Sequence, residues 1–143
     1  MTFTPSTNTV VWGGTANSIT ITSAGKAFYN FTIAPYNWSD NYALAGDVTI
    51  NHTFIVTNSN CAATVSGAYS FICNGDVKTN DTYSSYIRRY SETEATKISI
   101  AGSSDQTIGH ASKATSFGLT VDVTSSGGTV YFQGTINIRG RVS

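Results

Sequence analysis

The chain has 143 residues, 11% of them charged, and a formal net charge of zero at pH 7. This length fits one domain that buries a core without a metal or disulfide, and the neutral charge balance gives no support for binding to nucleic acid or to an anionic membrane. The 13 glycines and the abundance of threonine, serine and asparagine favour strands and tight turns over helices. We predict an all-β fold: a single antiparallel β-sandwich, jelly-roll or immunoglobulin-like, with about eight strands.

The sequence after Met1 lacks the basic and apolar regions of a secretory signal. No apolar run reaches the length of a membrane span, so no membrane insertion is expected. A surface with few charges is typical of proteins that lie outside cells or pack among copies of themselves. We therefore expect a location outside the cell or within an assembly of many copies, with a neutral, soluble sandwich as the alternative.

The chain is predicted to form two units: residues 1–17 as an N-terminal arm or edge strand, and residues 18–143 as the sandwich domain. Within the arm, residues 10–12 predict a short edge strand, and Trp12 either closes one end of the core or anchors a partner. Residues 18–22 and 27–33 both alternate between apolar and polar side chains, so we predict that they pair as a hairpin.

Segment 34–46 is the longest without a clean period, and it mixes aromatic rings with short amide and carboxylate side chains. A sugar site uses such a mixture, because rings stack on the apolar face of a pyranose while polar groups bond its hydroxyls. The candidate ligand residues are Tyr36, Trp38, Asp40 and Tyr42. The alternative is a structured loop whose aromatic side chains plug the end of the sandwich or contact another subunit.

Residues 47–57 predict a strand in which His52 shares a face with four apolar residues, so we interpret His52 as a hydrogen-bonded core residue. His52 and His110 lack the spacing of a metal-binding pair. No metal and no cofactor are predicted.

Cys61 and Cys73 are symmetric about Gly67, so a hairpin turning there would place the two thiols opposite each other. A cross-strand disulfide is geometrically conceivable. In a reducing compartment the same residues would stay as two small buried thiols. Both outcomes are left open.

Residues 74–97 form a second irregular region, in which Asn80 and Asp81 are placed to cap one helical turn through Tyr90. Arginine and tyrosine residues gather there, as they do at protein interfaces; the alternative is a surface loop with weak local ion pairs. Across the whole chain, the candidate interface residues are Trp12, Tyr83, Tyr86, Arg88, Arg89, Tyr90, Tyr131 and Gln133.

The C-terminal part is predicted to hold a strand at 97–101, a turn at 102–107, an irregular link at 109–117 and a terminal hairpin. In the hairpin, Val123 pairs with Val130 across a Ser-Ser-Gly-Gly turn, which brings both apolar faces to the same side. The outward row of the last strand carries no charge until Arg139. Because nothing on that row discourages another chain from covering it, we expect it to pack against a partner or to lie mid-sheet.

The sequence offers no signature of catalysis. No two carboxylates lie close together as glycoside hydrolysis requires, and no serine stands in a nucleophile elbow. We therefore expect a protein that is not an enzyme.

Residues 129–142, with the sequence TVYFQGTINIRGRV, resemble the ending of many small β-sandwich proteins of bacteriophage virions. That group includes capsid decoration proteins, head fibres and the receptor-binding tips of tail fibres. The resemblance implies a sandwich that is often trimeric and that binds the capsid lattice, other fibre chains or a host surface glycan.

Three functions follow as hypotheses. The first is a structural virion protein that acts through assembly with itself, as a homo-oligomer such as a trimer, and with other virion proteins. The second is a lectin-like module that binds a surface glycan or receptor, and the third is an extracellular adhesin or pilus-like subunit. None of them involves nucleic acid.

Overall fold

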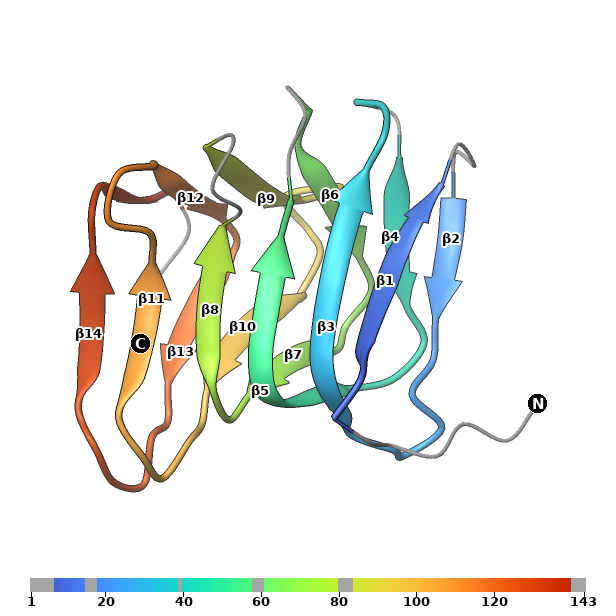
Figure 1. The fold of residues 1–143 in the computed structure, drawn as a ribbon. Coiled ribbons are helices and arrows are strands. Elements are labelled where there is room, and N and C mark those ends of the chain that lie inside the picture. Colours follow the sequence, from blue (N-terminus) through green and yellow to red (C-terminus); the bar gives the residue numbers. More distant parts are fainter. Residues whose placement is uncertain (1–6, 15–17, 39, 58–60, 80–83, 140–143) are drawn as a thin grey trace.

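The computed structural model describes residues 7–14, 18–38, 40–57, 61–79 and 84–139. Every regular element among these residues is a strand, which confirms the all-β prediction. The named strands pair in parallel, and the chain winds into a β-solenoid of about five turns (Figure 1). The predicted antiparallel β-sandwich of about eight strands, whether jelly-roll or immunoglobulin-like, is therefore wrong.

Within the described residues, the strands form two hydrogen-bonded sheets, of nine and six strands. Side by side at the front of Figure 1 lie β1 (Thr9–Gly14), β3 (Phe28–Pro35), β5 (Val48–Val56), β8 (Asp76–Thr79), β11 (Gln106–Gly109) and β14 (Val130–Gln133). The same sheet continues into β7 (Ser70–Cys73), β10 (Lys97–Ile100) and β13 (Thr120–Val123). The second sheet contains β2 (Ser18–Ile21), β4 (Asn41–Leu44), β6 (Ala63–Ser66), β9 (Ser85–Arg89), β12 (Thr115–Gly118) and β15 (Ile136–Ile138).

Strand β5 bends at the corner where the larger sheet divides. Its first residues, Val48–Ile50, pair with β7, whereas Thr53–Val56 pair with β8. The chain turns at Asn51 and His52, so the larger sheet divides into two stacks and the smaller sheet closes the third side. The predicted strand at 47–57 is confirmed in extent, but its apolar row is interrupted at this corner.

The core fills the inside of the solenoid with side chains that alternate along each strand. Phe54 and Phe71 stack with ring centroids 4.9 Å apart, and Phe31 stacks on Phe54 at 6.2 Å. These rings come from different turns, so burying each one ties neighbouring turns together, by roughly 1.5–3 kcal/mol per side chain. Trp12 packs on Phe31 at 6.0 Å and is half-buried at the first turn.

The terminal hairpin is a second prediction that proved wrong. Val123 stands beside Ile100, and Val130 stands beside Gln106, so β13 and β14 belong to different stacks. In the same way β2 pairs with β4 and not with residues 27–33. Alternation indicates only that one face of a strand is buried. It is therefore compatible with an antiparallel hairpin and with a solenoid turn alike.

The predicted cysteine hairpin is also wrong. Cys73 lies in β7, between Ile50 and Ile100 of the adjacent turns, whereas Cys61 precedes β6 in the other sheet. Both cysteines are buried, and they are not joined in a disulfide. Burial in the core raises the pKa of the Cys73 thiol far above its usual range, so this thiol stays protonated.

Two further expectations differ from the structure. His52 is exposed and does not lie in the core, because it occupies the corner of β5. The helical turn predicted through Tyr90 is replaced by strand β9, in which Ile87 points inward and Tyr86 and Arg88 point outward. Asn80, Asp81 and Tyr83 lie outside the described residues.

The segment after residue 97 is more regular than predicted. The strand at 97–101 is confirmed as β10, but the expected turn and irregular link contain β11 and β12. Strand β1 has one neighbour, β3, as the predicted edge strand at 10–12 should. Among the described residues, no helix has the length and apolar character to cross a membrane.

Candidate functional site

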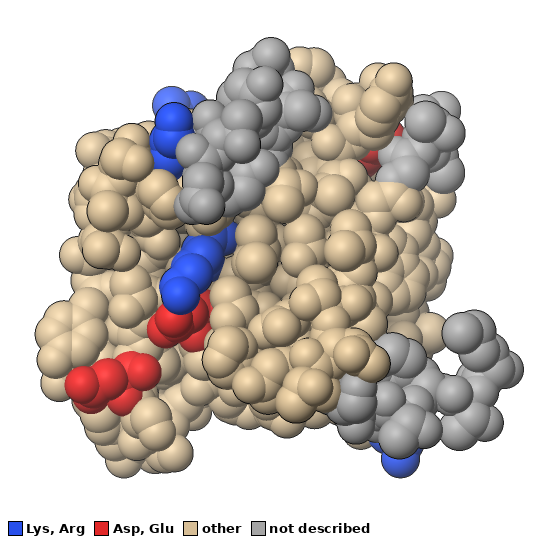
Figure 2. Space-filling model, viewed as in Figure 1, with Lys and Arg blue, Asp and Glu red and all other residues tan. Residues whose placement is uncertain are grey.

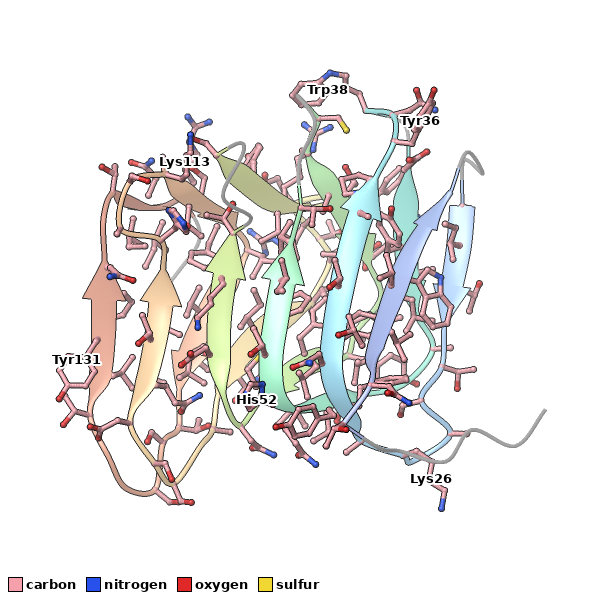
Figure 3. The ribbon with its side chains drawn as sticks, viewed as in Figure 1. Lys26, Tyr36, Trp38, His52, Lys113 and Tyr131 are labelled. Carbon is pink, nitrogen blue, oxygen red and sulfur yellow. The ribbon has the colours of Figure 1, made fainter. Side chains whose placement is uncertain are left out.

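The loop between β3 and β4 carries the two most exposed aromatic residues of the predicted ligand set. Tyr36 is 67% exposed and Trp38 is 60% exposed. Both lie at the upper edge of the molecule in Figure 3, where the loop rises above the ends of the strands. Large aromatic side chains usually lose most of their exposure in a folded protein, so two such rings in one short loop mark a candidate binding surface.

Asp40 holds this loop in shape from below. Its carboxylate is fully buried, and Oδ2 accepts hydrogen bonds from the backbone N–H groups of Tyr36 at 2.7 Å and Asn37 at 2.9 Å. The N–H of Asp40 donates in turn to the carbonyl oxygen of Asn37 at 3.2 Å. Charge-assisted bonds of this kind are roughly twice as strong as neutral ones, so the carboxylate fixes the backbone that carries both rings.

Tyr42 lies in the core beneath the loop. Burial, together with the charges of Asp40 and Cys61, raises the pKa of Tyr42 to about 12, so its hydroxyl stays protonated. The thiol of Cys61 donates to the carbonyl oxygen of Pro35 at 3.4 Å, on the same side of the loop. Of the four predicted ligand residues, Tyr36 and Trp38 therefore face solvent, while Asp40 and Tyr42 support them from inside.

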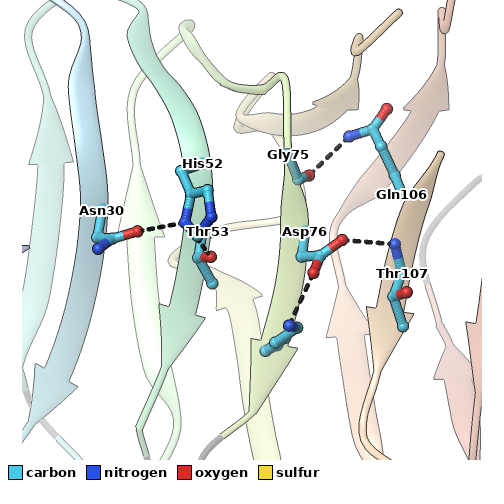
Figure 4. Close-up of polar contacts among 8 residues, drawn as sticks. Asn30, His52, Thr53, Gly75, Asp76, Gln106 and Thr107 are labelled. Carbon is cyan, nitrogen blue, oxygen red and sulfur yellow. Dashed lines mark hydrogen bonds and ion pairs between the residues drawn. The ribbon is translucent and has the colours of Figure 1, made fainter. Parts of the chain in front are cut away.

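A polar network covers the middle of the front stack (Figure 4). The ring of His52 stacks on Tyr29 with centroids 4.6 Å apart, and Nδ1 lies 2.9 Å from Oδ1 of Asn30 and 3.0 Å from Oγ1 of Thr53. The stacked ring of Tyr29 and two hydrogen-bonding groups fix the orientation of His52. Its role in the structure is therefore to brace the corner of β5.

Asp76 is the charged centre of the neighbouring strand. It pairs with Lys78 at 2.7 Å and accepts a hydrogen bond from the N–H of Thr107 at 2.8 Å. Partial burial by itself would raise the pKa of Asp76, but these bonds and the charges of Lys78 and His52 lower it below the usual value. The carboxylate is consequently ionised and already satisfied, which suits a structural role better than proton transfer.

The predicted interface residues are scattered over the molecule. Tyr90 is 68% exposed beyond β9, and Tyr131 is 52% exposed on β14, in the other sheet. Arg89 pairs with Glu92 at 3.3 Å, and Gln133 is exposed at the end of β14. The structure brings Tyr86 and Arg88 together on β9, and it keeps that pair apart from Trp12 and Tyr131, which belong to the front stack.

Two surfaces were missed by the sequence reasoning. The last turn exposes Phe132 by 51% and Val123 by 39%, both of which alternation predicted to be buried. A cavity of about 180 Å³ is lined by Ser84, Tyr86, Ser116 and Arg139, which come from three separate parts of the chain. Only the parallel register brings those residues together, and no local sequence motif predicts the cavity.

The surface around these sites is poor in charge. The face in Figure 2 is mostly uncharged, with a few basic and acidic side chains gathered toward one side. No group of three or more histidine, cysteine, aspartate or glutamate residues among those described is arranged to hold a metal ion. Comparisons with known protein families, curated proteins and solved structures gave no match.

Proposed function

We propose that this protein is a carbohydrate-binding module in which Tyr36 and Trp38 stack on sugar rings. The observation that carries the proposal is the exposure of both rings, 67% and 60%, on a loop whose backbone is held by the buried carboxylate of Asp40. A fixed loop loses little conformational freedom on binding, which favours affinity for a ligand that offers only weak contacts.

The chemistry of the surroundings favours a neutral glycan. The surface is rich in hydroxyl and amide side chains and poor in charge, so sugar hydroxyls meet groups that both donate and accept. The apolar C–H face of a pyranose suits an exposed aromatic ring. The solenoid contributes a rigid scaffold, because each turn is hydrogen-bonded to the next.

The test compares Trp38→Ala with Tyr90→Ala in a glycan array and by calorimetric titration of each glycan that binds. Tyr90 is 68% exposed but lies away from the loop, so it controls for the loss of an exposed ring. We expect Trp38→Ala to weaken binding by about tenfold or more, and Tyr90→Ala to leave it unchanged. Equal affinity in wild type and Trp38→Ala, or no binding to any sugar, would refute the proposal.

A second candidate is an assembly component, as in a phage particle. The exposed side chains of Phe132 and Val123 on the last turn favour it, since such apolar surface is commonly covered by a partner. Replacing Gln133 or Thr135 with Glu places charge beside this surface. We expect the substitution to lower the mass of any assembly measured by light scattering, and an unchanged mass would exclude this part of the surface as the contact.

A further inference from the structure

The sheet that contains β9, β12 and β15 places two arginines on either side of a glycine. Arg88 stands beside Gly118 in the register, and the N–H of Arg139 bonds the carbonyl oxygen of Phe117 at 2.8 Å, which sets Arg139 on the other side of Gly118. Neighbouring strands lie about 4.8 Å apart, so the two arginine backbones are separated by roughly 10 Å. The side chains of both residues project from the outer face.

Neutral partners hold the two guanidinium groups in place. The Arg139 guanidinium carbon lies 5.8 Å from the centroid of the Tyr86 ring, and Nε of Arg88 donates to Oγ1 of Thr64 at 3.2 Å. The ion pairs formed among the described residues belong to Lys78, Arg89 and Lys97. Neither guanidinium therefore forms an ion pair with a carboxylate of the described part of the chain.

The two hydroxyl groups beside Arg139 each accept a hydrogen bond and keep an O–H that can donate. Oγ of Ser84 accepts a hydrogen bond from the N–H of Ala114 at 3.2 Å, and Oγ of Ser116 accepts one from Nδ2 of Asn137 at 3.3 Å. A serine hydroxyl that accepts from a neighbour retains its own O–H to donate. The cavity of about 180 Å³ thus joins two such hydroxyls to a guanidinium and the ring of Tyr86.

Gly118 keeps this arrangement open. A methyl group there would lie 2.9 Å from the hydroxyl oxygen of Tyr86 and 3.0 Å from Cβ of Arg88. Both contacts are tighter than normal packing allows, so the ring could not stay in its place beneath Arg139. The glycine is the reason that Tyr86 lies across the strand and forms a wall of the cavity.

We propose that this cavity binds an oxyanion, a carboxylate or sulfate group, carried by a ligand no larger than an acidic sugar. It is lined by a guanidinium and two hydroxyl groups, and its volume is below the 300 Å³ or so at which pockets for larger organic ligands begin. Guanidinium groups bind planar carboxylates and sulfates through charge-assisted hydrogen bonds. The site is separate from the aromatic loop and does not depend on the function proposed for it.

The test titrates the full chain with sodium glucuronate, sodium sulfate and glucose at constant ionic strength, followed by backbone amide chemical shifts. We expect glucuronate or sulfate to shift the amides of Ser116 and Gly118, and glucose to leave them unmoved. Tighter binding of glucuronate than sulfate would assign the oxyanion to a sugar acid, and the reverse order would assign it to a free anion. Absence of a shift with either anion, or an equal shift with glucose, would overturn the proposal.

Matched variants separate the site from general charge. Arg139→Gln removes one guanidinium and should weaken anion binding by about tenfold. Lys26→Gln removes an exposed charge between β2 and β3, at the lower edge of the molecule in Figure 3, and should change nothing. A similar loss in both variants would mean diffuse attraction and no site. Because Arg139 is exposed, its replacement is expected to leave the fold intact, which circular dichroism verifies.

Discussion

A single glutamine shows how the corners of the solenoid are closed. The side chain of Gln106 is buried, and its Oε1 accepts a hydrogen bond from the N–H of Gly102 at 2.9 Å. Its Nε2 donates to the carbonyl oxygens of Cys73 at 3.0 Å and Gly75 at 2.6 Å. One amide thereby joins two successive turns where their backbones leave the strand ladder.

Replacing Gln106 with Ala should lower the free energy of unfolding by about 3 kcal/mol, because buried backbone groups lose their partners. Gln133→Ala is the matched control: that side chain is exposed, and the change should stay within about 0.5 kcal/mol. Urea denaturation of both variants measures the difference. Similar stabilities for the two would show that water replaces the buried amide at no cost.

At the scale of elements, the connections between strands matter as much as the strands. Between β7 and β8 the chain turns within Asn74 and Gly75, and a methyl group on Gly75 would overlap the carbonyl oxygen of His52 in the preceding turn. The backbones of successive turns approach closely there, so no side chain fits. Between β4 and β5, by contrast, Gly46 faces open space.

The pair Gly75→Ala and Gly46→Ala tests this difference in corner packing. Gly75→Ala should destabilise the fold by about 3 kcal/mol, since the backbone of His52 cannot move without breaking the corner. Gly46→Ala should be neutral or stabilising by up to about 1 kcal/mol, because it restricts the unfolded chain. Thermal melting of both proteins gives the comparison, and equal melting temperatures would contradict the close approach at Gly75.

The whole molecule is a stack in which each turn contacts its neighbours. Strands β13, β14 and β15 end their stacks and have one neighbour each, whereas β5 and β7 have partners on both sides. The last turn also exposes the side chains of Tyr131 and Phe132. Stability in such an array is a sum of turn-to-turn contacts, so the outermost turn is expected to open first.

Hydrogen exchange followed by mass spectrometry should therefore find graded protection. Amides of β14 and β15 are expected to exchange well before those of β5 and β7, because local opening of the last turn breaks one interface while opening of a middle turn breaks two. One common exchange rate for all strands would mean that the solenoid unfolds as one cooperative unit. That result would contradict the prediction that stability is a sum of contacts between neighbouring turns.

Sequence reasoning succeeded where the signal is local. Residues 48–56 and 97–100 alternate cleanly, and both are strands with the expected side chains buried. It failed at His52, whose apolar neighbours belong to two different sides of the solenoid. It also predicted that Asp40 binds ligand, whereas this carboxylate turns inward to accept bonds from two backbone N–H groups. A short polar side chain in a loop gives the same sequence pattern whether it binds a ligand or accepts hydrogen bonds from the backbone of its own loop.

The sequence by itself determined that the fold is all-β and identified a part of the core, because a period of two depends only on neighbouring side chains. Tertiary structure alone decided that the strands stack in parallel. Val48 pairs with Phe71 and Ile98 with Val121 at a spacing of 23 residues, but Ile87 pairs with Phe117 at a spacing of 30. Because the corners differ in length, the sequence shows no constant repeat from turn to turn. The register is set by hydrogen bonding between whole turns. The cavity beside Arg139 depends on that same register.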